Sequence, residues 1–169
     1  MITINYNGDH SRVAQAVIEA NKLLQDEKFF EEIGAHPRFD LTEATSVQIS
    51  SSIKNCTAQM TIEFYTTLNP WSRANAYDDP EHPLVIHLNT RKLNRTVASI
   101  CATLIHEAIH AADAIDHQLS YAHGDNDATG KENTAPYWID SLAYKIVSGG
   151  DIQPQEFQHD SMSNDKPDK

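Results

Sequence analysis

Hydrophobic and polar residues alternate along two short segments of this chain, 2–6 and 58–66. Alternation with a period of two predicts a β-strand that is buried on one face only. A third segment, 84–88, reads Leu-Val-Ile-His-Leu and predicts another strand. We expect this strand at the edge of a small mixed or antiparallel sheet, where an extended peptide could pair with it.

Apolar residues recur at helical spacing in three longer segments, 12–33, 96–118 and 136–147. Residues that favour helix ends flank these segments: Ser11 as an N-cap, Gly34 and Pro37 after the first helix, Pro136 in the first turn of the last helix, and Gly149 and Gly150 after it. The segments therefore predict an N-terminal helix, a central helix and a C-terminal helix.

The other segments carry weaker signals. Residues 41–55 could open a short helix or a strand, and the Asn-, Asp- and Pro-rich segment 69–83 predicts a loop. With 169 residues, the chain is long enough for one self-sufficient core. We predict a single α+β domain over residues 1–150, and a flexible acidic and polar tail over 151–169.

The central predicted helix carries the sequence His106-Glu107-Ala-Ile-His110. Side chains four residues apart lie on one face of a helix, so both imidazoles can bind one metal ion. Glu107 lies about 100° around the helix from His106, close enough to hold a metal-bound water without being a ligand. This HExxH pattern is typical of zinc metallopeptidases and predicts one catalytic Zn²⁺, with Glu107 as general acid and base.

A catalytic zinc ion usually has three protein ligands, so a third must lie outside the pentad. We favour His123, because enough chain follows the helix for it to turn back, and Gly124 permits a tight backbone beside the metal. Glu132 is the alternative, as in zincins that use a glutamate from a following helix.

Two nearer residues fit less well as the third ligand. Asp116 would need a glycine turn at position 113, which is an aspartate here, so the helix is expected to carry Asp116 away from the metal. His117 shares a helix face with His110 but lies roughly 10 Å of helical rise beyond it.

Three further residues are candidates for supporting roles. Asp113 could accept the second N–H of an imidazole ligand, or be a surface carboxylate. Tyr121 and Tyr137 could stabilise an oxyanion, although buried tyrosines more often serve as packing groups.

For two other sets of polar residues, a structural interpretation is simpler than a functional one. His87, on the strand predicted over 84–88, could face the cleft, but a structural histidine is the simpler interpretation. Asp125, Asn126 and Asp127 could hold a second cation, although such a sequence usually forms a turn.

The order of these motifs resembles the SprT-like metalloprotease family. HExxH followed by Ala111, and then His123-Gly124 after a spacer, is similar to the family pattern, as are Arg73-Ala74, Ile86-His-Leu-Asn89 and Pro136-Tyr-Trp-Ile. The similarity covers about residues 70–148. It implies that His106, His110 and His123 bind zinc and that Glu107 is the catalytic acid–base.

Two departures from the family pattern affect what the resemblance implies. Residues 125–136 separate His123-Gly124 from Tyr137-Trp138, where the family usually has only a few residues. The family members that act on DNA-bound substrates also carry basic or zinc-ribbon elements, which this sequence lacks. The departures weaken the link to DNA and leave the chemistry intact.

The composition of the chain narrows the classes of molecule that it could bind. The chain has 13 Lys and Arg against 24 Asp and Glu, a net charge of −11, which disfavours binding to a phosphate backbone. We expect a protein or peptide substrate. Cys56 and Cys101 are too few for a disulfide scaffold, and the sequence contains neither a signal-peptide pattern nor an apolar run of membrane-spanning length. These features favour a cytoplasmic protein that does not enter membranes.

The sequence leaves two other functions open. A zincin-like fold could bind zinc without turnover, although a structural zinc site does not require Glu107. A narrow-specificity effector or toxin protease would have the same motif.

Overall fold

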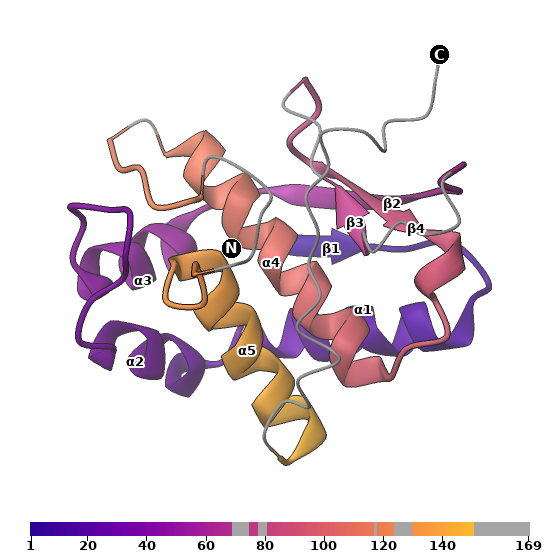
Figure 1. The fold of residues 1–169 in the computed structure, drawn as a ribbon, viewed down its shortest axis with the longest axis horizontal. Coiled ribbons are helices and arrows are strands. Elements are labelled where there is room, and N and C mark those ends of the chain that lie inside the picture. The colour runs from indigo at the N-terminus through magenta and orange to yellow at the C-terminus, as the bar shows by residue number, and fades with distance from the viewer. Residues whose placement is uncertain (69–74, 78–80, 117, 124–129, 151–169) are drawn as a thin grey trace.

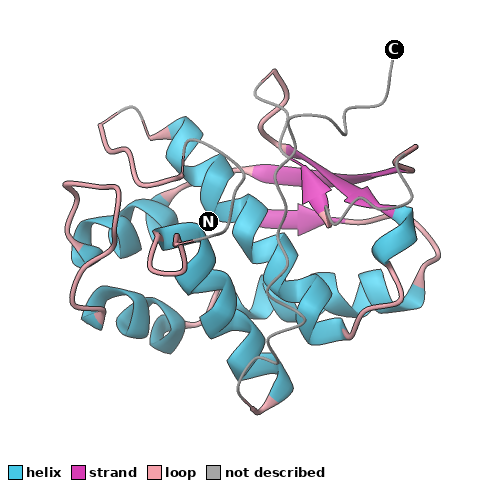
Figure 2. Cartoon of the chain, in the orientation of Figure 1, coloured by secondary structure: helices cyan, strands magenta, loops and turns pink. Residues whose placement is uncertain are grey.

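The computed structural model describes residues 1–68, 75–77, 81–116, 118–123 and 130–150. Helices lie on one side of a small sheet, as Figures 1 and 2 show. The elements in chain order are β1 (Thr3–Asn5), α1 (Ser11–Leu23), α2 (Glu27–Ala35), α3 (Ser46–Asn55), β2 (Gln59–Tyr65), β3 (Ala76–Tyr77), β4 (Val85–Asn89), a 3-10 turn (Thr90–Lys92), α4 (Val97–Ile115) and α5 (Ala135–Ser148). The fold is therefore α+β, as predicted.

The sheet is mixed, with strand order β1-β2-β4-β3. Strands β1, β2 and β4 are parallel to one another, and β3 pairs antiparallel with β4. The prediction that residues 84–88 form an edge strand is wrong, because β3 pairs with β4 through His87 and Leu88. The two-residue strand β3 lies within the segment predicted as a loop, where it is too short to show a period of two.

The N-terminal helix predicted over 12–33 is two helices. The chain leaves the first helix at Leu24, and Asp26 starts the second, accepting a hydrogen bond from the Lys28 N–H at 3.0 Å. The predicted N-cap was also displaced by one residue, since the His10 side chain accepts from Val13 N at 3.4 Å. An internal cap inside a continuous apolar stripe therefore divided the segment.

The ambiguous segment 41–55 contains α3. Thr45 and Gln48 form a capping box, in which each side chain bonds the backbone N–H of the other residue. This Thr-x-x-Gln arrangement is a helix-start signal that the sequence already contained.

Helix α4 runs through the centre of the domain and packs against both α1 and α5 (Figure 1). Thr96 caps it by accepting from Ser99 N at 3.1 Å, and the helix ends at Ile115, before the predicted end at residue 118. Most of its side chains are buried, including Ile100, Leu104 and Ile105. The polar side chains on this helix are therefore held inside the protein.

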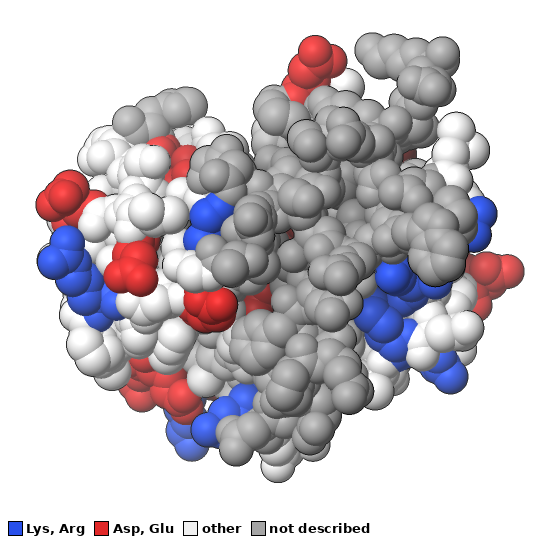
Figure 3. All heavy atoms as spheres, in the orientation of Figure 1, with Lys and Arg blue, Asp and Glu red and all other residues white. Residues whose placement is uncertain are grey.

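Helix α5 ends as predicted, because Gly149 adopts a left-handed conformation with φ of 72°. Within the described residues, no helix has the length and apolarity required to cross a membrane. Both signs of charge occur on the described surface of the face in Figure 3.

Candidate metal centre

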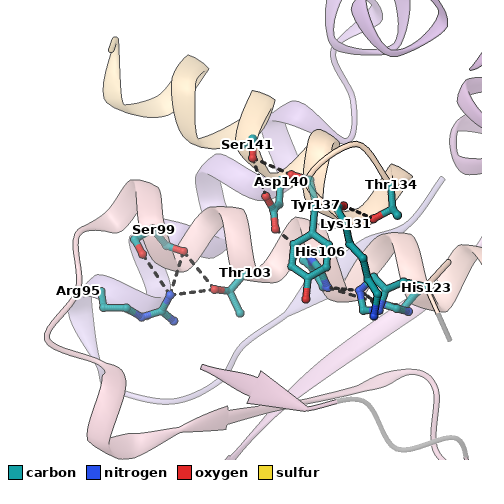
Figure 4. Close-up of polar contacts among 11 residues, drawn as sticks. Arg95, Ser99, Thr103, His106, His123, Lys131, Thr134, Tyr137, Asp140 and Ser141 are labelled. Carbon is teal, nitrogen blue, oxygen red and sulfur yellow. Dashed lines mark hydrogen bonds and ion pairs between the residues drawn. The ribbon is translucent and has the colours of Figure 1, made fainter. Parts of the chain in front are cut away.

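Three imidazoles converge at one point beside α4. His106 and His110 come from α4. His123 comes from the segment that follows it, and Figure 4 shows its ring beside that of His106. The Nε2 atom of His106 lies 3.2 Å from that of His110 and 3.2 Å from that of His123, and the His110–His123 distance is 3.1 Å. The structure thus brings together the three histidines that the sequence proposed as ligands.

The spacing of these nitrogens fits a tetrahedral metal ion. Zinc–nitrogen bonds of about 2.0 Å at tetrahedral angles place two ligand nitrogens about 3.3 Å apart. His106 and His123 are only 4% and 7% exposed, so their rings are enclosed by protein. A neutral imidazole that presents an Nε2 lone pair is a zinc ligand, and the donor set therefore fits Zn²⁺.

Asp140 of α5 fixes the tautomer of His106. Its Oδ2 atom lies 2.8 Å from His106 Nδ1, and both side chains are buried. A carboxylate that accepts the Nδ1–H leaves the lone pair on Nε2, the atom that faces the other two histidines. Ser141 Oγ in turn donates to Asp140 Oδ1 at 3.2 Å.

Sequence reasoning missed Asp140 and proposed Asp113 in this role. The available signal was an aspartate among the apolar residues of the last helix, between Ile139 and Leu142, where a charged side chain needs a partner. Pairing between α4 and α5 could not be derived from spacing along the chain.

Tyr137, also on α5, contacts two of the imidazoles. Its ring is stacked on His123, with centroids 4.7 Å apart and an interplanar angle of 15°. It meets His106 edge-on at 4.7 Å and 63°. Tyr137 is buried and forms an aromatic wall of the site.

Hydrogen bonds between side chains and the backbone hold the segment that follows α4. Asp116 Oδ1 accepts from Gln118 N at 3.0 Å, which ends the helix, and the Thr42 hydroxyl donates to the Ser120 carbonyl at 2.7 Å. Asp113 Oδ1 then accepts from Tyr121 N at 2.7 Å. Asp113 therefore serves the turn that delivers His123, and burial raises the pKa of its carboxyl group.

Tyr121 is a fully buried core residue whose hydroxyl oxygen lies 3.1 Å from Ser52 Oγ. Burial raises the pKa of its phenol. These contacts agree with a packing role for Tyr121.

Glu107 is 8% exposed and lies between the two histidines of α4. Glu132, the alternative ligand, is exposed, and its Oε1 accepts from Gly130 N at 3.3 Å. The group of potential ligands found among the described residues contains His106, His110 and His123 without Glu132.

Of the remaining candidates, the structure describes His87. His87 is half-buried on β4, with Nδ1 3.8 Å from Glu63 Oε2. His117, Asp125, Asn126 and Asp127 lie outside the described residues, as do Arg73 and Ala74 of the family resemblance.

No protein-family model, curated protein sequence or solved structure matches this chain.

Proposed function

We propose that this protein is a zinc-dependent metalloprotease of the SprT-like type, which hydrolyses peptide bonds in a protein or peptide substrate. The observation that carries this proposal is the convergence of three Nε2 atoms within 3.2 Å of one another, with a buried glutamate next to His106 in the sequence. Three histidine ligands leave a fourth tetrahedral position open, which distinguishes catalytic zinc sites from closed structural sites.

When bound there, Zn²⁺ would act as a Lewis acid that polarises a carbonyl group and lowers the pKa of bound water toward neutrality. Glu107 accepts the proton of the attacking water on a carboxylate oxygen and delivers it to the leaving amine. Asp140 holds the proton on His106 Nδ1 throughout, so that Nε2 stays a lone-pair donor.

The order of motifs along the chain supports the SprT-like assignment. The pentad, the His123-Gly124 pair and a following helix that begins Ala-Pro-Tyr-Trp occur in the family order, and the structure places His123 and that helix at the same site.

The test compares the wild type with Glu107→Gln, with Glu132→Gln as a matched control that makes the same change on an exposed glutamate. We expect one zinc ion per chain in all three by elemental analysis. Cleavage of an unfolded protein, followed by mass spectrometry, should fall at least about 100-fold in Glu107→Gln and remain unchanged in Glu132→Gln.

Two results would change the proposal. A zinc-loaded wild type that cleaves no member of a peptide library would favour a zinc-binding module without turnover. Unchanged zinc affinity in His123→Ala, together with weakened affinity in Glu132→Gln, would move the third ligand to Glu132.

A further inference from the structure

Helix α5 places two buried side chains against the metal centre, Tyr137 and Asp140, which lie three residues apart and therefore on one face of the helix. We propose that this face of α5 is a positioning element for the site: Asp140 fixes the ring of His106, and Tyr137 fixes the ring of His123. The inference rests on the proposed function in that it names the residues that hold the same metal site in its binding geometry.

The first contact sets both the orientation and the basicity of a ligand. Rotation of the His106 ring away from its position would break the 2.8 Å bond to Asp140 Oδ2 and leave a carboxylate that is 2% exposed without this partner. A carboxylate on Nδ1 also makes the opposite nitrogen a stronger electron donor to a metal. The single Ser141 hydroxyl hydrogen is shared between the Tyr137 carbonyl, at 2.7 Å, and Asp140 Oδ1, at 3.2 Å, which links the two positioning residues.

The second contact orients a ligand that does not belong to a helix. His106 and His110 are held by the same helix, whereas His123 stands on a non-helical segment. The parallel ring of Tyr137 covers one face of the His123 imidazole, and its edge contact with His106 joins both ligands to one aromatic wall. Loss of this ring would remove the stacked contact on that face of His123.

The start of α5 is itself anchored on its other side. The Asn133 carbonyl accepts from Asp40 N at 3.0 Å, and its side chain donates to the Arg38 carbonyl at 3.1 Å. The His36 ring lies against Trp138, with centroids 4.3 Å apart, and its Nε2 is 2.9 Å from Asn133 Oδ1. The helix that presents Tyr137 and Asp140 is therefore held in place from the side opposite the metal centre.

The test measures zinc affinity by competition with a chromophoric chelator and records the visible spectrum of the Co²⁺-loaded protein. We expect Asp140→Ala to weaken zinc binding by about 10- to 100-fold and Asp140→Asn by about 10-fold, because asparagine keeps an acceptor but has no charge. Tyr137→Leu should weaken binding by about 10-fold, whereas Tyr137→Phe, which keeps the ring, should bind like the wild type. Asp140→Ala and Tyr137→Leu should both change the Co²⁺ spectrum.

A matched control separates positioning from simple destabilisation. Tyr144→Leu removes a second buried tyrosine of α5 that packs against Ala98 and Ala102, away from the imidazoles. This variant should bind zinc with wild-type affinity, even where the melting temperature falls.

Wild-type zinc affinity and an unchanged Co²⁺ spectrum in Asp140→Asn and Tyr137→Leu would overturn the proposal and reduce this face of α5 to core packing. If Asp140→Ala fails to fold, the isosteric Asp140→Asn variant decides the question. The metal measurements need no turnover. If the α5 variants bind metal more weakly and the wild type cleaves no peptide, the positioning role stands and the protease proposal fails. If the wild type cleaves peptides and the α5 variants bind metal as the wild type does, the protease proposal stands and the positioning role fails.

Discussion

Two buried polar networks lie along α4, and they differ in how donors and acceptors are matched (Figure 4). Near the start of the helix, one guanidinium nitrogen, Arg95 Nη1, donates to the Ser99 carbonyl, the Ser99 hydroxyl and the Thr103 hydroxyl at 2.9–3.3 Å. Farther along, three imidazole nitrogens of the same kind face one another. The first network pairs unlike groups, whereas the second gathers like groups.

This difference separates a structural network from a binding site. A network that pairs a cation with oxygen atoms needs no added ion to bring its members together, and its effect is to hold the start of α4. Three converging lone-pair donors repel one another unless a cation lies between them.

The largest expected effect is stabilisation of the second network by metal. Zinc at about 100 times its dissociation constant should stabilise the metal-free protein by about 2.7 kcal/mol and raise its melting temperature by roughly 5–10 °C. A chelator should reverse the shift in a thermal melt. The shift should disappear in His106→Ala and persist in an Arg95 variant; a shift of equal size in both would remove the distinction between the networks.

The next effect is on the first network. Arg95→Met keeps much of the aliphatic side chain and removes the donors to Ser99 and Thr103, so we expect a loss of about 1–3 kcal/mol in the free energy of unfolding. Zinc affinity should stay at the wild-type value. Urea unfolding and chelator competition measure the two quantities, and a variant that keeps its stability but loses zinc would show that the networks are coupled.

A smaller effect concerns Asp113, which belongs to neither network. Burial raises the pKa of this carboxyl group in the folded protein. As the pH rises, Asp113 therefore loses its proton in the unfolded chain before it does so in the folded one. The free energy of unfolding falls between the ordinary pKa and the raised pKa. Asp113→Asn removes this dependence. The melting temperature of the metal-free variant relative to the metal-free wild type should therefore be higher at pH 7 than at pH 3.5; the opposite order would contradict the assignment.

The smallest effect is a reactivity difference between the two thiols. Burial raises the pKa of Cys101 on α4 to about 12, whereas Cys56 is only half-buried. A disulfide exchange reagent should label Cys56 in the native protein and Cys101 only after unfolding. Because Cys101 lies on α4 between Ser99 and Thr103 in the sequence, faster labelling in Arg95→Met than in the wild type would report local opening of α4.

The sequence predicted those parts of the fold and site that depend on local spacing. Residues 106, 107 and 110 share one helix, so their relation follows from the helical repeat, and Gly149 ends α5 because of its left-handed φ. The break at Asp26 was missed because the apolar stripe continues through it, and β3 because two residues show no period.

Contacts between segments distant in the sequence could not be derived in this way. The bond between His106 and Asp140 joins residues on two helices, and it depends on how α4 and α5 cross. Asp113 was expected beside an imidazole because it follows His110 by three residues, but the returning chain offers it the Tyr121 N–H instead.

The contacts between residues 36–40 and 133–138 determine whether the motif-bearing part of the chain could form the site on its own. The stretch 70–148, which carries the recognisable motifs, excludes β1 and β2, two of the three parallel strands, and also His36, which lies against Trp138. A fragment limited to that stretch would carry every candidate ligand while lacking the support on which α5 rests. The recognisable motifs are therefore not an independent unit that could be transplanted, and the unfamiliar first part of the chain is inseparable from the metal centre.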